Sequence, residues 1–163
     1  MKNEVLLDHD RPSRTGLAEA IFASGKSLSQ LREICREIQE LDKPMLFTRL
    51  EAEAYEALAE EFPDLLNYVA VSRTATHRQL PTPEHKLSAP IAVVTGGSSD
   101  VHVAREASET LRFYGYPVTE IDDVGVAGLW RIQARLDELK ECPIVICVAG
   151  MDAALPKIGR AHV

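Results

Sequence analysis

The chain has few cysteines, no long apolar run and no excess of positive charge. Its three cysteines, Cys35, Cys142 and Cys147, form no CxxC pair, so the sequence predicts no zinc site and fits a reducing compartment. No segment approaches the length of a membrane span. The charged opening, MKNEVLLDHDRPSR, lacks the apolar stretch of a secretory signal. We therefore expect a cytoplasmic protein without a membrane partner.

The charge balance is acidic, with 25 Asp and Glu against 18 Lys and Arg and a formal net charge of −7 over 163 residues. Nucleic-acid binding needs cations that neutralise phosphates, so this balance argues against a nucleic-acid partner. A small anion stays compatible with it, because backbone N–H groups bind anions whatever the net charge. The five histidines show no ligand spacing, and the residues predict no metal site.

The order of predicted elements divides the chain into two α/β units. In the first unit, over 1–72, Ser27 begins a helix whose apolar positions recur at helical spacing. Helices are expected over 16–23, 28–41 and 50–61, and strands over 45–48 and 66–71. Residues 73–90, which contain three prolines, are predicted as a linker.

The second unit, over 91–157, alternates between apolar strands and helices. Strands are expected over 91–95, 118–121 and 144–148, and helices over 101–114 and 129–139. This βαβαβ order predicts a doubly wound parallel sheet with right-handed crossovers. The sheet is expected to be incomplete, and residues 158–163, IGRAHV, are interpreted as a non-native read-through tail. In the first of these helices, the predicted core face carries Val103, Ala107, Leu111 and Tyr114.

Small and polar residues follow each strand of the second unit. The first turn is GGSSD over 96–100, the second is DDVGVAG over 122–128, and the third is AGMD over 149–152. Because the carboxyl ends of parallel strands meet at one edge of a sheet, we expect the three turns to line one pocket. Glycines let a ligand approach the backbone, and helix N-termini attract anions.

The predicted site therefore combines binding residues and one catalytic carboxylate. The binding residues are Gly96, Gly97, Ser98, Ser99, Asp100, Gly125, Gly128, Arg131, Gly150 and Met151. Asp152 is the candidate general base, and Arg131 can pair with a carboxylate or phosphate. A plainer interpretation stays open, in which the polar residues of these turns only cap the helices that follow.

A further motif, Gly25-Lys26-Ser27, is similar to the end of a nucleotide-binding P-loop. The first glycine of such a loop would fall at Ala20, and no strand is predicted before the motif. We therefore do not interpret it as a phosphate loop.

Several segments resemble LarB proteins over nearly all of residues 8–157. TGGSSDVHVAREA is similar to their GTSD…PVAEEA, DVGVAGLWR to DVGVAG-L-HR, and VAGMDAALP to AGMEGALPS. Residues 8–30 are similar to the family's opening, D-x-x-R-x-x-R-x-G-x-x-E-x-x-x-x-x-G-K-[ST], and Phe47-Thr48-Arg49 to its A-T-R.

The resemblance implies a C-terminal PurE-like domain, similar to aminoimidazole ribonucleotide carboxylase, and assembly into homo-oligomers through that domain. It implies carboxylation of the pyridinium ring of nicotinic acid adenine dinucleotide with CO2 and hydrolysis of its phosphoanhydride. The products are pyridinium-3,5-biscarboxylic acid mononucleotide and AMP, in nickel-pincer cofactor synthesis. No tightly bound cofactor is expected beyond CO2 as co-substrate, and a divalent metal ion is left open. The family's catalytic cysteine is expected beyond residue 158, so this chain alone is expected to be inactive.

Carried onto this sequence, the resemblance assigns the nucleotide's phosphate and ribose region to Ser99 and Asp100. Gly125, Gly128 and Arg131 would line the pocket. Asp152 stands where the family has Glu. Two alternatives stay open. One is a PurE-type aminoimidazole ribonucleotide carboxylase, against which the lack of a histidine in DVGVAG argues. The other is a non-catalytic nucleotide-binding module.

Overall fold

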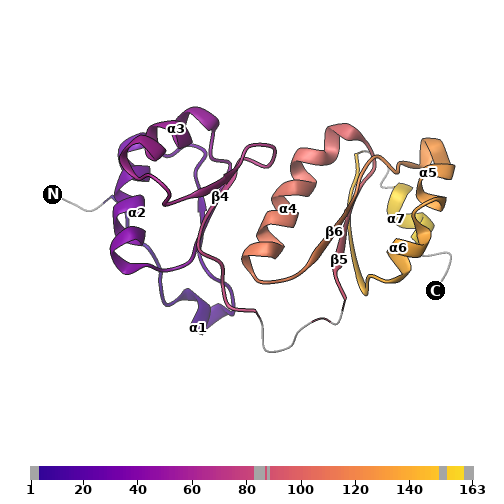
Figure 1. Cartoon of the computed structure of the whole chain (residues 1–163), viewed down its shortest axis with the longest axis horizontal. Helices are drawn as coiled ribbons and strands as arrows, with labels where there is room; N and C mark the ends of the chain where they lie inside the picture. Colours follow the sequence, from indigo (N-terminus) through magenta and orange to yellow (C-terminus); the bar gives the residue numbers. More distant parts are fainter. Residues whose placement is uncertain (1–3, 83–86, 88, 151–153, 160–163) are drawn as a thin grey trace. The chain divides into compact units, whose positions relative to one another are not determined.

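The computed structural model describes residues 4–82, 87, 89–150 and 154–159, and it divides into two units, Met1–Leu80 and Pro81–Val163 (Figure 1). A four-stranded sheet forms the first unit and a three-stranded sheet the second. The predicted α/β class, with a parallel sheet in the second unit, is confirmed. No helix within the described ranges is both long and apolar enough to cross a bilayer.

The first unit has a mixed sheet in the order β1-β2-β4-β3. Its elements are α1 (Arg11–Thr15), β1 (Ala20–Phe22), α2 (Leu28–Leu41), β2 (Met45–Thr48), α3 (Ala52–Glu61), β3 (Asn67–Val69) and β4 (Thr74–His77). β1 and β2 run parallel with α2 as their crossover, whereas β4 pairs antiparallel with both β2 and β3. Helices α2 and α3 contribute to one hydrophobic core with this sheet.

Helix α2 begins at a capping box. The backbone N–H of Gln30 donates to Oγ of Ser27 (3.3 Å), and the N–H of Ser27 donates back to Oε1 of Gln30 (2.9 Å). The buried face of the helix consists of Leu31, Ile34, Cys35 and Ile38. The predicted helix, with Cys35 in the core, is thus present.

Two predictions for the first unit are wrong. Residues 16–23 do not form a helix, because Gly16 ends α1 with a φ of +77° and the chain then extends into β1, where Ile21 is buried against the core. The predicted linker over 73–90 begins with a strand instead. β4 pairs on both sides, and its residues Thr74 and Ala75 are buried. Both segments are strands because their backbones pair with strands that are distant in sequence: β1 with β2, and β4 with β2 and β3.

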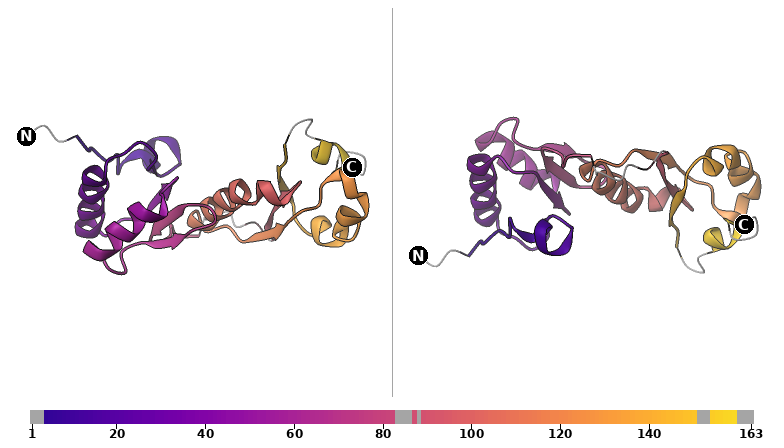
Figure 2. Two further views of the ribbon diagram at one scale, coloured as in Figure 1. Left: turned by 90° about the horizontal axis from the view of Figure 1, so that it is seen from above. Right: turned by 90° about the horizontal axis from the view of Figure 1, so that it is seen from below.

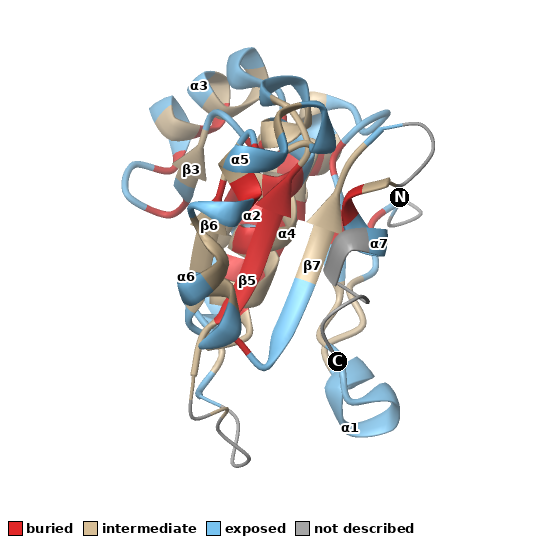
Figure 3. Ribbon diagram, turned by 90° about the vertical axis from the view of Figure 1, so that its right-hand side faces the viewer, coloured by how far each residue is buried: buried red, intermediate tan, exposed pale blue. Residues whose placement is uncertain are grey.

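The second unit is a parallel sheet in the order β6-β5-β7. Its elements are β5 (Ile91–Thr95), α4 (Val101–Phe113), β6 (Val118–Ile121), α5 (Leu129–Gln133), α6 (Leu136–Lys140), β7 (Ile144–Val148) and α7 (Ala154–Gly159). α4 lies on one face of the sheet and α5, α6 and α7 on the other (Figures 1 and 2). The central strand β5 is buried at every position (Figure 3).

Two details of the second unit differ from expectation. Val103 of α4 is 40% exposed, whereas Ala104, Ser108 and Phe113 are buried, so the helix is rotated from its predicted face. The helix predicted over 129–139 is broken into α5 and α6. Ile132 of α5 packs in the core of this unit, and at the break the N–H of Arg135 donates to the carbonyl of Ile132 (3.0 Å).

The described part of β7 carries an open edge. β7 pairs with β5 on one side, and Ile144 and Val145 remain 44% and 45% exposed (Figure 3). Unpaired strand edges with apolar side chains favour intermolecular pairing. We predict that the chain self-associates and that Val145→Lys, which places a charge on this edge, lowers the associated fraction in light scattering.

Leu41→Lys supplies the matched control, because Leu41 is comparably exposed at the end of helix α2 and lies on no strand edge. It should leave the scattering profile of the chain unchanged. A wild-type chain that is monodisperse and monomeric would contradict the prediction.

Candidate functional site

The three turns of the second unit meet at the carboxyl edge of its sheet. A Cβ built on Gly125 would lie 2.3 Å from the carbonyl oxygen of Gly96, so the second turn packs directly on the first. A Cβ built on Gly96 would lie 3.0 Å from Cβ of Ala149, at the start of the third turn. The structure thus brings Gly96, Gly125 and the residue before Gly150 into contact.

Buried Thr95, the last residue of β5, holds the second turn in place. Its carbonyl accepts the N–H of Val124 (3.0 Å), and its Oγ1 accepts the N–H of Asp123 (2.8 Å). These two hydrogen bonds, one to the side chain and one to the backbone of Thr95, hold the segment that follows β6 in place. Asp123 has a φ of +54°, a left-handed conformation that these bonds hold.

In the first turn, the side chain of Asp100 accepts a hydrogen bond from the backbone of the same turn. Its Oδ2 accepts the N–H of Gly97 (2.9 Å), which closes the short 3-10 turn Ser98–Asp100 before α4. Gly96 and Gly97 are half-buried, and Ser98 and Ser99 are exposed. This geometry matches the capping interpretation for Asp100 and leaves the two serine side chains facing solvent at the start of a 13-residue helix.

In the second turn, Arg131 lies over Gly128 and is paired. Its guanidinium contacts the carboxylate of Asp123 at 2.8 Å and stacks 5.7 Å from the ring centre of Trp130. A Cβ built on Gly128 would lie 3.0 Å from Nε of Arg131, so the glycine leaves room for this side chain. The positive charge of Arg131 is therefore partly neutralised by Asp123, which lies in the turn just before α5.

The sequence analysis missed Arg105, which anchors the same turn from helix α4. Its guanidinium pairs with Asp122 at 2.5 Å and with Glu120 at 3.2 Å, and its side chain is largely buried. The hydrogen bond to Asp122 raises the pKa of Arg105, so the charge persists. An arginine one helical turn into α4 gives no motif, and only the packing of α4 beside β6 brings it next to Asp122.

The third turn is described as far as Gly150, which is exposed. Its start is tied to the first turn, because the N–H of Gly96 donates to the carbonyl of Val148 (2.8 Å). Met151 and Asp152 lie outside the described residues. The candidate base therefore stays a prediction from the sequence.

None of the three thiols belongs to the turns that form this rim. Cys35 is in the core of the first unit, where burial raises its pKa to about 12. Burial likewise raises the pKa of Cys142, before β7, and of Cys147, inside β7. A thiol with a raised pKa holds little thiolate, so none of the three is suited to be a nucleophile. Among the described side chains, no group of three or more His, Cys, Asp or Glu is arranged to hold a metal ion.

A family model matches the first unit. Residues 3–79 match the model of the LarB/PurE-like N-terminal domain, which confirms the resemblance to LarB proteins over this part of the chain. The match includes β4.

A curated relative extends the similarity to the second unit. The chain is 28% identical, over 97% of its length, to the uncharacterized protein MJ0165 of Methanocaldococcus jannaschii. The chain spans 64% of the length of that relative.

We predict that Gly125→Ala destabilises the second unit. The new methyl group would overlap the Gly96 carbonyl oxygen, which belongs to the backbone and cannot rotate away. Displacing it costs roughly 1–3 kcal/mol, which urea denaturation measures as a lower midpoint. Gly150→Ala is the control, because a Cβ there meets nothing within 4 Å. Equal midpoints for the two variants would contradict the packing described here.

We also predict slow alkylation of all three thiols in the folded chain at mildly alkaline pH. Their raised pKa values lower the thiolate fraction, so the rate with iodoacetamide should fall below that of a free cysteine peptide, most of all at Cys35. Unfolding in urea should restore the rate. Fast native labelling of Cys147, located by mass spectrometry of the digested chain, would show a reactive thiol in β7.

Proposed function

We propose that the second unit binds nicotinic acid adenine dinucleotide at the rim formed by its three turns. We further propose that the whole protein catalyses a LarB-type carboxylation of the pyridinium ring with CO2 and then hydrolyses the phosphoanhydride. The observation that carries the proposal is the contact of Gly125 and Ala149 with Gly96, which gathers three glycine-containing turns at one sheet edge. The LarB-type domain of the first unit supports it.

The rim carries hydrogen-bond donors and one positively charged side chain that could bind the phosphates of a dinucleotide, although the protein as a whole is acidic. Gly97 has no side chain, and a Cβ built there would meet its nearest neighbours only at 3.7 Å, so a phosphate oxygen can approach the backbone at this position. The corresponding space at Gly96 and Gly125 is filled by Ala149 and by the Gly96 carbonyl. The N-terminus of α4, with Ser98 and Ser99 exposed before it, offers N–H and hydroxyl donors to an anion. Arg131 adds a guanidinium beside the second turn, held in position by Asp123.

The chemistry needs a nucleophile and a base but no change of oxidation state. In the LarB-type reaction a thiolate adds to the pyridinium ring, and the opposite ring carbon then attacks CO2 to form a carbon–carbon bond. Loss of the ring proton and of the thiolate restores the aromatic ring, and water cleaves the phosphoanhydride to release AMP. Asp152 is our candidate for accepting the proton. Because the pKa values of Cys35, Cys142 and Cys147 are raised, we assign this chain to substrate binding rather than to nucleophilic attack.

We predict that the chain binds nicotinic acid adenine dinucleotide in calorimetric titration and that Asp100→Ala weakens this binding at least about tenfold. Removing the carboxylate leaves the N–H of Gly97 without its acceptor, so the first turn loses the shape that presents its backbone. Asp137→Ala is the matched control, because Asp137 is a fully exposed carboxylate on α6 and makes one surface ion pair.

Comparing the affinities of the two variants shows whether a loss of binding comes from the first turn or from the change in net charge. Removing either carboxylate changes the net charge equally, so an effect confined to Asp100→Ala points to the turn. Unchanged affinity in Asp100→Ala would remove this residue from the site. Absence of any binding heat in the wild-type chain would overturn the proposal.

A further inference from the structure

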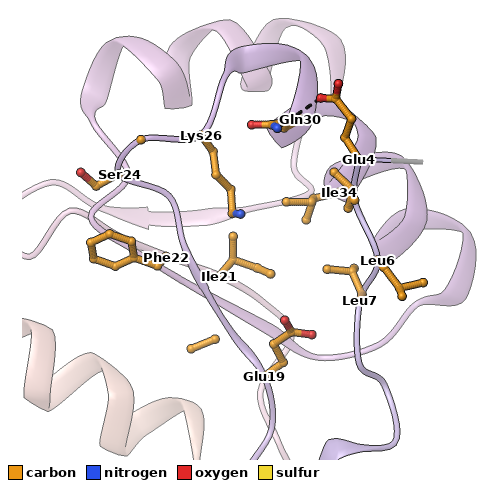
Figure 4. A pocket seen from close by; sticks show the side chains of 13 residues that line it. Glu4, Leu6, Leu7, Glu19, Ile21, Phe22, Ser24, Lys26, Gln30 and Ile34 are labelled. Carbon is orange, nitrogen blue, oxygen red and sulfur yellow. Dashed lines mark hydrogen bonds between the residues drawn. The ribbon is translucent and has the colours of Figure 1, made fainter. Parts of the chain in front are cut away.

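A cavity of about 520 Å³ lies in the first unit, beside the free edge of β1. Its walls come from the stretch 4–7, from β1 with its flanking residues, and from α2 (Figure 4). Ile21 and Ile34 supply buried apolar surface, whereas Lys26 and Glu19 bring charges into the cavity. The volume is in the range of small-molecule sites, which combine apolar walls with a few polar groups.

Lys26 points into this cavity and lacks a partner. Figure 4 shows its side chain extending from the turn before α2 toward Ile21 and Ile34. Within the described part of the chain, its ammonium makes no ion pair or hydrogen bond. The arginines Arg14, Arg32, Arg36, Arg73 and Arg78 of the same unit each pair with a carboxylate. An ammonium group without a carboxylate partner keeps its donors for charge-assisted hydrogen bonds to an anion.

Other polar side chains of the cavity are occupied by internal bonds. Glu19 accepts the N–H of Asp8 at 2.6 Å, which ties the carboxylate to the chain entering α1. The amide of Gln30 donates to Glu4 (3.3 Å) and accepts the N–H of Ser27. These bonds hold Glu4 and Glu19 in the wall, where both keep their negative charge, and Lys26 supplies the positive charge of the lining.

The local fold also corrects the interpretation of Gly25-Lys26-Ser27. A strand does precede this motif, because β1 ends at Phe22 and α2 begins at Leu28. Gly25 has a φ of +84°, and the N–H of Lys26 donates to the carbonyl of Ala23 (3.0 Å), so a tight turn directs the lysine. Three positions of the opening motif, Glu19, Gly25 and Lys26, thus line one cavity although they are separated along the chain.

We propose that this cavity binds a small organic anion, a carboxylate or phosphate carried on an apolar body, with the oxyanion at Lys26 and the body against Ile21 and Ile34. The cavity lies wholly within the first unit, so the inference does not depend on the function proposed for the second. Charge-assisted hydrogen bonds from the ammonium supply the specificity for an anion, and apolar burial supplies the remaining affinity.

The test is a titration of the 15N-labelled chain, followed by amide chemical shifts, with three separate probes. Benzoate and inorganic phosphate distinguish a carboxylate from a phosphate, and benzamide keeps the ring of benzoate without its charge. Shifts are expected for residues 19–26 with benzoate, phosphate or both, and at least about tenfold weaker binding is expected for benzamide.

Variants at Lys26 assign the effect to its charge. Lys26→Met should weaken anion binding at least about tenfold, whereas Lys26→Arg should retain it. Lys43→Met is the matched control, because Lys43 is also exposed in the first unit and does not line the cavity. A dispersed amide spectrum confirms that each variant is folded.

Three results would overturn the proposal. They are the absence of shifts over 19–26 with both anions at millimolar concentration, equal binding of benzamide and benzoate, and unchanged anion binding in Lys26→Met. A carboxylate-only or phosphate-only response supports it and identifies the anionic group.

Discussion

Two bonds at Thr95 are the constraint on which the rim of the second unit depends. This residue ends the central strand, and its carbonyl and hydroxyl both receive N–H groups from the turn after β6. The turn is thereby placed so close to Gly96 that only a glycine fits at position 125. Since β7 is joined to the same loop through the N–H of Gly96, the three strand ends form one backbone surface. A ligand at this edge would meet this backbone surface together with the exposed side chains of Ser98 and Ser99.

The charged side chains around this backbone surface are already bonded to other groups of the protein, so few of them are available to bind a ligand. Asp122 is neutralised by Arg105, Arg131 by Asp123, and Asp100 is engaged with the N–H of Gly97. Side-chain charge at the rim is therefore largely structural. The N–H groups of Gly96, Gly97, Asp123 and Val124 are also bonded internally, so a phosphate at the rim would depend on the N-terminal turn that leads into α4. In the first unit, by contrast, Lys26 extends into a cavity, and it makes no ion pair with any described carboxylate.

Local sequence signals predicted the elements that depend on short-range physics. The capping box at Ser27 and the apolar stripe of α2 specify a helix without help from other segments. The alternation over 91–148 specifies parallel strands with crossover helices, because each apolar run is long enough for one buried strand. The same reasoning failed at Ala20–Phe22 and Thr74–His77, where pairing with β2 from distant positions outweighs local propensity. It also misjudged the face of α4, since Ser108 rather than Val103 faces the core.

For the candidate site, the sequence by itself determined which turns follow parallel strands and hence that Gly96, Gly125 and Gly150 belong to one edge. Motif residues that are separated along the chain also predicted the resemblance to LarB proteins, and the family model matches residues 3–79. Only the tertiary structure decided which polar groups are paired internally, such as Asp122 with Arg105, and which have no partner among the described residues, such as Lys26. Hydrogen-bond and ion-pair partners come from segments far apart in sequence, and their approach is set by strand register and packing, which no local pattern encodes.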